Sequence, residues 1–228
     1  MRHALALGTL AATVGLSGPE AGRTQSFPAP EGADDLIKLF REKRQGRAAE
    51  LERHLAKDPE DLQARIELAQ TYALSGHLDQ AITTYREVLT RDPTNITARF
   101  NLALVYHRAG RLAEAATEFR EVIRRDPTDL AARIDLGVLL RDQQGALAQE
   151  AVEVLEAARR LRPDYADTYY HLGLAYKGLG DRTLACRTLY EQAVQAFDRY
   201  LALQPDGKRA PEATAWKLRL SDRLRGEC

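Results

Sequence analysis

The chain has 228 residues with 33 basic and 33 acidic side chains, so its formal net charge at pH 7 is zero. This balance excludes a strong long-range attraction to nucleic acid or to an acidic membrane, and we expect no nucleic-acid partner.

Residues 1–17 have the pattern of a secretory signal peptide. Residues 1–3 carry a short positive start, residues 4–16 contain no charge, and residues 17–19 break the apolar run. The apolar run is too short to span a bilayer, so we expect no transmembrane span. The pattern predicts an exported protein, periplasmic or secreted; the alternative is a cytoplasmic protein with a flexible leader. Residues 18–32, rich in proline and glycine, are predicted to form a flexible linker.

A 34-residue period organises the rest of the chain. Three Asp-Pro pairs, at residues 58–59, 92–93 and 126–127, are spaced 34 residues apart. The same offset relates residues of matching size: Ala69 and Ala103, Tyr72 and Tyr106, Gly76 and Gly110, Leu78 and Leu112, Ala81 and Ala115, Tyr85 and Phe119, and Val88 and Val122. A fixed period in this range predicts one supersecondary unit that is stacked into an array.

Each unit is predicted to contain two helices joined by a short turn. In the unit at residues 62–95, apolar residues recur at spacings of three and four up to residue 74, which is the pattern of one helix face. The pattern restarts after the turn at Ser75, Gly76 and His77, and it stops at Pro93, which cannot continue a helix. A helical hairpin of this kind cannot bury its apolar face alone, so it stacks on its neighbours.

The elements expected along the chain follow from this unit. Residues 33–61 are predicted to form a degenerate first hairpin, with apolar positions at Leu36, Leu39, Phe40, Leu51 and Leu55. Complete hairpins are predicted at residues 62–95, 96–129, 130–165 and 166–205, the third with a two-residue insertion in its turn and the fourth with an extended second helix. That helix, predicted over residues 183–204, would project about 12 Å beyond its neighbours at 1.5 Å per residue. Residues 206–228 are predicted to form a capping helix that opens at Pro211.

The motifs of these units resemble those of the tetratricopeptide repeat family. One repeat carries Leu68-Ala69, Tyr72, Gly76, Ala81, Tyr85 and Pro93, and the next carries Leu102-Ala103, Tyr106, Gly110, Ala115, Phe119 and Pro127. The resemblance covers most of residues 33–205, although Leu140 replaces the motif tyrosine in the third repeat. It implies an all-α fold: a right-handed superhelical solenoid of stacked helix-turn-helix hairpins with a C-terminal capping helix.

The sequence carries no pattern of catalytic or metal-binding residues. The histidines show no His-x-x-x-His spacing, and none is near a cysteine in the sequence. No phosphate-binding Gly-x-x-x-x-Gly-Lys segment is present, and the glycines at residues 178–180 match the turn that the repeat requires. We therefore expect a protein that is not an enzyme, with no metal, no cofactor and no small-molecule substrate.

The resemblance also indicates where a protein or peptide partner would bind. In this family the first helices of successive hairpins line the concave face, and the fifth, sixth and ninth positions of each repeat face inward. The residues that this predicts for the groove are Ile66, Gln70, Phe100, Asn101, Leu104, Ile134, Asp135, Val138, Tyr170, His171 and Leu174. The fifth and ninth positions lack the Lys and Asn with which the family's chaperone-binding members hold a terminal carboxylate. An apolar strip beside a polar row instead favours an extended peptide or an amphipathic helix, with Asn101 paired to a backbone amide of the ligand.

Two functions remain open at this stage. The first is a non-catalytic protein-interaction scaffold that binds a peptide or helical segment of a partner in the concave groove. The alternative is a structural subunit of an envelope or oligomeric complex, which assembles through the extended helix and the convex face. For the groove residues, the competing interpretation is that the apolar side chains simply pack between hairpins.

The two cysteines, Cys186 and Cys228, are candidates for a disulfide. A terminal helix that returns antiparallel to the extended helix would bring them together, because both segments are about 25–27 Å long at 1.5 Å per residue. Closing this loop would add roughly 3–4 kcal/mol in the chain-entropy model. The bond would persist only in an oxidising compartment, and the alternative is a buried thiol at Cys186.

Overall fold

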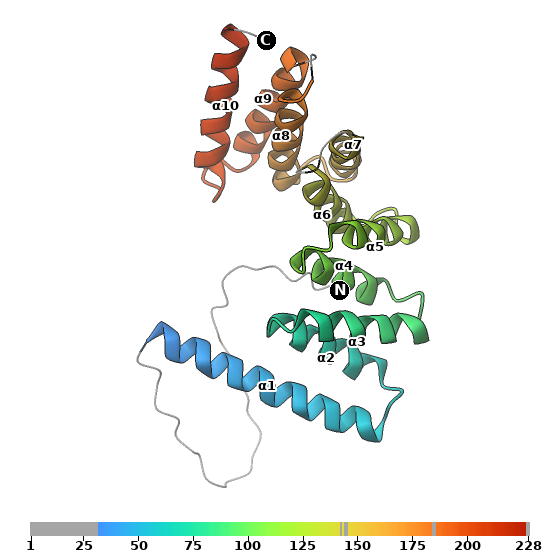
Figure 1. The fold of residues 1–228 in the computed structure, drawn as a ribbon. Helices are drawn as coiled ribbons and strands as arrows, with labels where there is room; N and C mark the ends of the chain where they lie inside the picture. Colours follow the sequence, from blue (N-terminus) through green and yellow to red (C-terminus); the bar gives the residue numbers. More distant parts are fainter. Residues whose placement is uncertain (1–31, 142, 144–145, 184–185, 227–228) are drawn as a thin grey trace.

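A computed structural model describes residues 32–141, 143, 146–183 and 186–226 of the chain. Within these ranges the protein forms ten α-helices and no strands, and successive helices pair and stack in sequence order (Figure 1). The prediction of an all-α solenoid is therefore confirmed. The predicted leader, and all of the predicted linker except Gly32, lie outside the described residues. No helix in the described part of the chain has both the length and the apolar character that a membrane crossing requires.

The helices alternate as first and second members of the hairpins. A long helix, α1 (Ala33–Lys57), precedes four pairs: α2 (Leu62–Leu74) with α3 (Leu78–Arg91), α4 (Ile96–Arg108) with α5 (Leu112–Arg125), α6 (Leu130–Arg141) with α7 (Ala146–Leu161), and α8 (Ala166–Gly180) with α9 (Cys186–Leu203). The last helix, α10 (Ala210–Arg225), packs along α9. We call α2, α4, α6 and α8 the A helices, and α3, α5, α7 and α9 the B helices.

The same local signals begin and end the helices of successive repeats. The side chains of Asp61, Asn95 and Asp129 each accept a hydrogen bond of 2.9 Å from the backbone N–H three residues later, which caps α2, α4 and α6. The turns after α2 and α4 place Gly76 and Gly110 at φ values of 82° and 73°, a left-handed conformation that favours glycine. Because these signals recur every 34 residues, the helices of successive repeats begin and end at matching positions.

Close contact between the two helices of a hairpin depends on small residues. A Cβ atom on Gly137 would lie 2.5 Å from Leu155 Cγ, and a Cβ atom on Gly173 would lie 2.6 Å from Phe197 Cε1. Ala103, at the equivalent position of an earlier repeat, is completely buried. A larger side chain at these positions would push the two helices apart.

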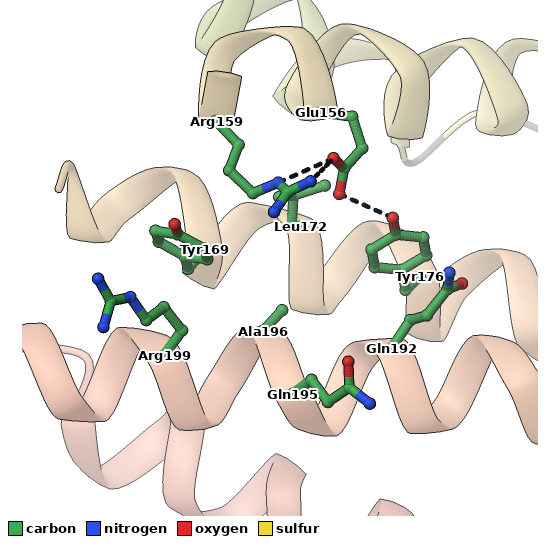
Figure 2. Close-up of a pocket in the computed structure, with 9 residues that line it drawn as sticks. All are labelled: Glu156, Arg159, Tyr169, Leu172, Tyr176, Gln192, Gln195, Ala196 and Arg199. Carbon is green, nitrogen blue, oxygen red and sulfur yellow. Dashed lines mark hydrogen bonds and ion pairs between the residues drawn. The ribbon is translucent and has the colours of Figure 1, made fainter. Parts of the chain in front are cut away.

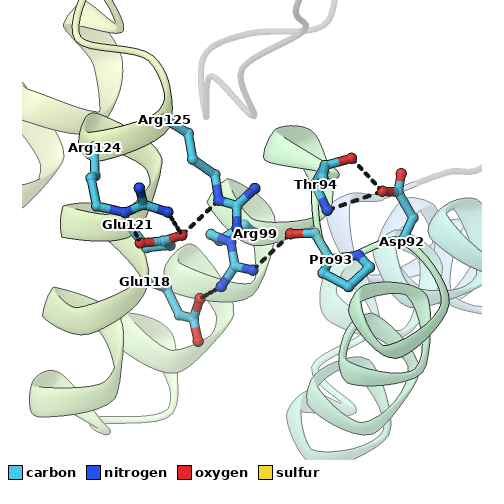
Figure 3. A network of polar contacts seen from close by, with 8 residues as sticks. All are labelled: Asp92, Pro93, Thr94, Arg99, Glu118, Glu121, Arg124 and Arg125. Atoms are coloured by element: carbon cyan, nitrogen blue, oxygen red, sulfur yellow. Dashed lines mark hydrogen bonds and ion pairs between the residues drawn. The ribbon is translucent and has the colours of Figure 1, made fainter.

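Arginines on α2 and α4 connect these helices to the loops before them. Arg99 donates a hydrogen bond of 3.0 Å to the Pro93 carbonyl and forms an ion pair of 2.7 Å with Glu118 on the following B helix (Figure 3). One repeat earlier, Arg65 makes the equivalent contact with the Pro59 carbonyl at 2.6 Å. These bonds hold α2 and α4 in a fixed position relative to the preceding loops.

The apolar core is divided into two main clusters along the array. The first contains buried residues of α2 to α6 together with Ala151 of α7, and the second contains Val152 and Leu155 of α7 together with residues of α8 to α10. The two clusters therefore meet on α7. Figure 1 shows that the helix axes also change direction in this region, between α5 and α8.

The prediction of a hairpin over residues 33–61 is wrong, because α1 is one continuous helix of 25 residues. Gly46 is the only glycine in the middle of this segment, and a single glycine costs a helix interior about 1 kcal/mol without ending it. The C-terminal half of α1 packs on α2 through side chains such as Leu51, whereas Phe40 in the N-terminal half is 54% exposed.

The C-terminal end differs from the prediction in length but not in direction. The described part of α9 runs from Cys186 to Leu203, and its 18 residues exceed the 14 of α3 by four, which corresponds to about 6 Å of extra helix where the prediction was 12 Å. α10 returns antiparallel to α9, because Arg187 near the start of α9 donates a hydrogen bond of 3.4 Å to the carbonyl of Leu224 near the end of α10. Cys186 is disulfide-bonded. Because Cys228 lies outside the described residues, the pairing of these two cysteines stays a prediction.

Candidate functional site

The residues predicted to line the groove all lie on the A helices, but they differ in exposure. Four of them are buried, with 8% or less of their surface exposed: Ile66, Asn101, Tyr170 and His171. The other seven are partly buried and reach the surface: Gln70, Phe100, Leu104, Ile134, Asp135, Val138 and Leu174. The four buried side chains belong to the packing of the array, so only the other seven are available to a ligand.

Contacts with neighbouring helices explain the burial. Ile66 is part of the first core cluster. Asn101 is 2% exposed and lies against the hydroxyl of Tyr85 on α3, so the expected bond from Asn101 to a ligand amide is not available. Tyr170 is covered by the guanidinium of Arg209, which lies 5.0 Å from the centre of the tyrosine ring, just before α10.

His171 is held in its neutral form. Arg141 Nη1 donates a hydrogen bond of 3.1 Å to His171 Nδ1, which must therefore act as the acceptor. Burial, together with the positive charges of Arg141 and Arg209, lowers the pKa of His171 to about 3. The imidazole thus carries no positive charge at neutral pH.

The surface of α6 carries a carboxylate among apolar side chains. Ile134 and Val138, one turn apart, are partly exposed and belong to neither of the two main core clusters. Asp135 follows Ile134, and within the described residues no hydrogen bond or ion pair holds its carboxylate. Burial raises the pKa of Asp135 to about 6, with a further contribution from the negative charge of Asp129.

Other charged side chains on the A helices are paired, including Glu67 at the position of α2 that matches Asp135. The ion pairs are Glu67 with Arg47 at 2.8 Å, Asp167 with Arg209 at 2.7 Å, and Lys177 with Asp181 at 2.8 Å. Asp135 differs from these groups because it is both desolvated and unpaired within the described chain. This combination of a lone carboxylate and apolar neighbours is the most distinctive chemistry on the A-helix surface.

A second hollow, which the sequence did not predict, lies between the B helices α7 and α9 and has a volume of about 550 Å³ (Figure 2). Its lining comes from three helices: Glu156 and Arg159 of α7, Tyr169, Leu172 and Tyr176 of α8, and Gln192, Gln195, Ala196 and Arg199 of α9. The Tyr176 hydroxyl donates to Glu156 at 2.8 Å, and Glu156 also pairs with Arg159 at 2.7 Å. The polar groups of this hollow therefore largely satisfy one another.

One substitution within the repeat pattern could have indicated this hollow from the sequence. Tyr169 stands at the repeat position that Arg65 and Arg99 occupy in earlier units, and its hydroxyl makes the same contact, a bond of 2.8 Å to the carbonyl of Pro163. The tyrosine replaces the arginine in binding the preceding loop, but it carries no charge for an ion pair with the following B helix.

One group of three side chains among the described residues could hold a metal ion. The ligand atoms of His54, Asp58 and Asp61 lie within 4.8 Å of one another. Asp61 already caps α2, and its second oxygen lies 2.8 Å from His54 Nε2. We assign this group to the connection between α1 and α2.

The fold and the A-helix surface define a helical repeat scaffold, a class in which stacked hairpins create extended surfaces for binding other molecules. Models of the tetratricopeptide repeat match residues 41–92, 75–129, 143–180 and 166–206. The chain belongs to the tetratricopeptide repeat family, whose members mediate protein–protein interactions and are typically non-catalytic.

Solved structures share this architecture at low sequence identity. A MamA protein is 24% identical with a TM-score of 0.59, and the match covers 73% of this chain and 90% of that chain. MamA from Desulfovibrio magneticus RS-1 is 19% identical with a TM-score of 0.57, covering 74% and 97%. PilF from Pseudomonas aeruginosa is 24% identical with a TM-score of 0.57, covering 73% and 70%. These likenesses concern the fold alone, and no curated protein sequence matches the chain.

Proposed function

We propose that this protein is a non-catalytic scaffold that binds a segment of a partner protein, an extended peptide or an amphipathic helix, along its A helices. One observation carries the proposal: partly exposed apolar side chains occupy the same register on three successive A helices. They are Phe100 and Leu104 on α4, Ile134 and Val138 on α6, and Leu174 on α8. Helices α6 and α8 are in direct contact, which supports one continuous strip over these two helices.

The chemistry of this strip suits a protein segment. Removing partly exposed apolar surface from water favours binding by about 25 cal/mol per Å². Polar groups beside the strip, such as Gln70 and Asp135, suit the polar groups that accompany apolar side chains in a peptide.

A matched pair of variants tests this proposal. The full chain is immobilised and binders are selected from a library of random displayed peptides, and their affinities are then measured for each variant. Val138→Glu should abolish binding, because a charge would be desolvated against an apolar ligand. Ala113→Glu places the same charge on an exposed site of the B helix α5 and should have no effect. Phe100 is a poor probe, because its ring packs at 5.7 Å on Phe119 in the core.

Two results would contradict groove binding. One is a library that yields no binder to the wild-type chain. The other is equal binding by the wild type and by Val138→Glu, when circular dichroism shows the same helix content for both.

We also propose that the scaffold acts outside the cytoplasm. The support is the signal-like pattern of residues 1–17, together with the disulfide at Cys186, a bond that persists in oxidising compartments. Fractionation of cells that express the full chain, with N-terminal sequencing of the product, tests this. Recovery of the uncut chain with reduced cysteines in the cytoplasm would contradict it.

A self-assembling subunit remains the second candidate, with a different surface from the one that the sequence suggested. α10 packs along α9, so the extended helix is not free. The N-terminal half of α1 instead exposes Leu36, Ile37 and Phe40. Light scattering on the full chain separates the candidates: a monomer supports the scaffold, and a dimer that Phe40→Glu disrupts supports the subunit.

A further inference from the structure

We propose that Asp135 makes the A-helix surface selective for partner segments that present a lysine or arginine side chain next to apolar residues. This inference rests on the proposed function and names the chemistry of the segment that the scaffold binds.

The first argument is that Asp135 is a negative charge without compensation. Its carboxylate has no hydrogen bond or ion pair within the described residues, although protein atoms surround it closely enough to raise its pKa to about 6. The ionisable groups that act on it or lie near it are Asp129 at the start of α6 and Tyr165 at the start of α8, and neither supplies a positive charge. A charge in this state gains strongly from a counter-ion, because the surrounding protein screens it less than water does.

The second argument is that nearby positive charges in the described chain already have partners. Arg209 pairs with Asp167 at 2.7 Å, and Arg141 donates to His171. His171 itself is neutral, since burial and these two arginines lower its pKa to about 3. Arg162 pairs with Asp164 at 3.3 Å, and Arg133 donates to the backbone carbonyl of Asp129 at 3.4 Å. A cation that forms an ion pair with Asp135 must therefore come from a ligand.

The third argument is the apolar surroundings of this carboxylate. Val138 lies three residues after Asp135, on the same face of α6, and Ile134 adjoins it. Lysine and arginine suit such a site better than a free cation does, because their aliphatic stems pack on apolar surface while the charged end reaches a carboxylate. Arginine can also bind a carboxylate through two parallel hydrogen bonds.

The same features argue against other ligands for this position. A terminal carboxylate, or an acidic side chain, would be repelled by Asp135. A metal ion would find only one free carboxylate, because the side chain of the nearby Asp129 caps α6. A backbone N–H of the ligand is the remaining alternative. It would not raise the frequency of Lys and Arg among selected peptides, whereas recognition of a basic side chain would.

The experiment compares peptide selection on the wild type and on Asp135→Asn, which keeps the shape of the side chain and removes its charge. Random displayed peptides are selected on each full-length protein, and the frequency of Lys and Arg is compared with the unselected library. The wild type should enrich one basic residue flanked by apolar residues. Asp135→Asn should still select apolar peptides and should lose the basic preference.

A double-mutant cycle on the strongest wild-type peptide then measures the contact itself. Either Asp135→Asn or replacement of the peptide's basic residue by glutamine should weaken binding about 10- to 100-fold, the range expected for a charge-assisted hydrogen bond. Both changes together should cost no more than one alone. Affinity for the wild type should also fall about tenfold from pH 7.5 to pH 5, as Asp135 is protonated around its pKa of about 6, with no such change for Asp135→Asn.

The outcomes separate this inference from the proposed function. If Val138→Glu abolishes binding but the selected peptides show no basic preference, binding along the A helices is supported and the role proposed for Asp135 is wrong. If the basic preference persists in Asp135→Asn, another group on the protein binds the basic side chain of the peptide, and the inference is again overturned. If no peptide binds at all, the proposed function fails and this inference fails with it.

Discussion

Asp135→Asn should make the folded protein more stable at neutral pH, although asparagine adds no new contact. The carboxylate of Asp135 is desolvated in the folded state and pairs with nothing in the described chain, so ionising it works against folding. Asparagine has nearly the same shape and no charge. The substitution therefore removes a destabilising term and leaves the packing in place.

The magnitude follows from the pKa. A rise from 3.8 to about 6 corresponds to about 3 kcal/mol of free energy at pH values above both numbers. Partial exposure of the side chain reduces this, so we expect a gain of about 1–3 kcal/mol. The sign is set by proton binding: between pH 4 and pH 6 the folded state holds the proton of Asp135 more often than the unfolded state does. The free energy of unfolding of the wild type therefore falls as pH rises through this window.

Urea unfolding followed by circular dichroism, at several pH values, tests this reasoning. The gain from Asp135→Asn should be absent near pH 4, should grow up to about pH 6, and should stay constant above it. Asp206→Asn, at an exposed site between α9 and α10, is the matched control and should change little. Equal stability of the wild type and Asp135→Asn at pH 7.5, or a gain that persists at pH 4, would refute the account of a desolvated carboxylate.

Three further predictions concern the fold. Gly173→Ala should lower the free energy of unfolding by about 1–3 kcal/mol, because its Cβ would lie 2.6 Å from the ring of Phe197. Gly46→Ala, inside α1 and with no atom within 4 Å of the new Cβ, should raise it by roughly 0.5–1 kcal/mol, and urea titrations that rank the two variants in the opposite order would contradict the packing described. Thiol titration of denatured, unreduced protein should find no free thiol, whereas two per chain would rule out the pairing of Cys186 with Cys228.

Much of the fold could be predicted because the sequence repeats its own local signals. Cap residues such as Asn95 and turn glycines such as Gly76 act over a few residues, and each recurs after 34. α1 was mispredicted because it lacks these signals. Apolar residues occur near both ends of this segment, as in a hairpin, but no residue in its middle breaks the helix.

The candidate site could be predicted by position but not by exposure. Sequence register placed the predicted residues on the A helices, since the register depends only on the period. Whether each side chain is exposed depends on contacts between repeats, and the sequence pattern does not reveal these. Tyr170 is buried because Arg209 lies over its ring and the rings of Phe197 and Tyr200 pack against it, and these contacts join residues far apart in the sequence. The special state of Asp135 is likewise a product of its surroundings and not of a motif.

The two main core clusters divide the apolar core of the described array into two halves in series. Because they meet on α7, the packing interactions that join one half of the array to the other are concentrated at that helix and at the contact between α6 and α8. In a linear array each repeat is stabilised only by its neighbours, so the two halves are coupled to each other through these contacts at their junction alone. A segment bound across α4, α6 and α8 would bridge the junction, and an occupied scaffold would then resist bending and unfold in one step.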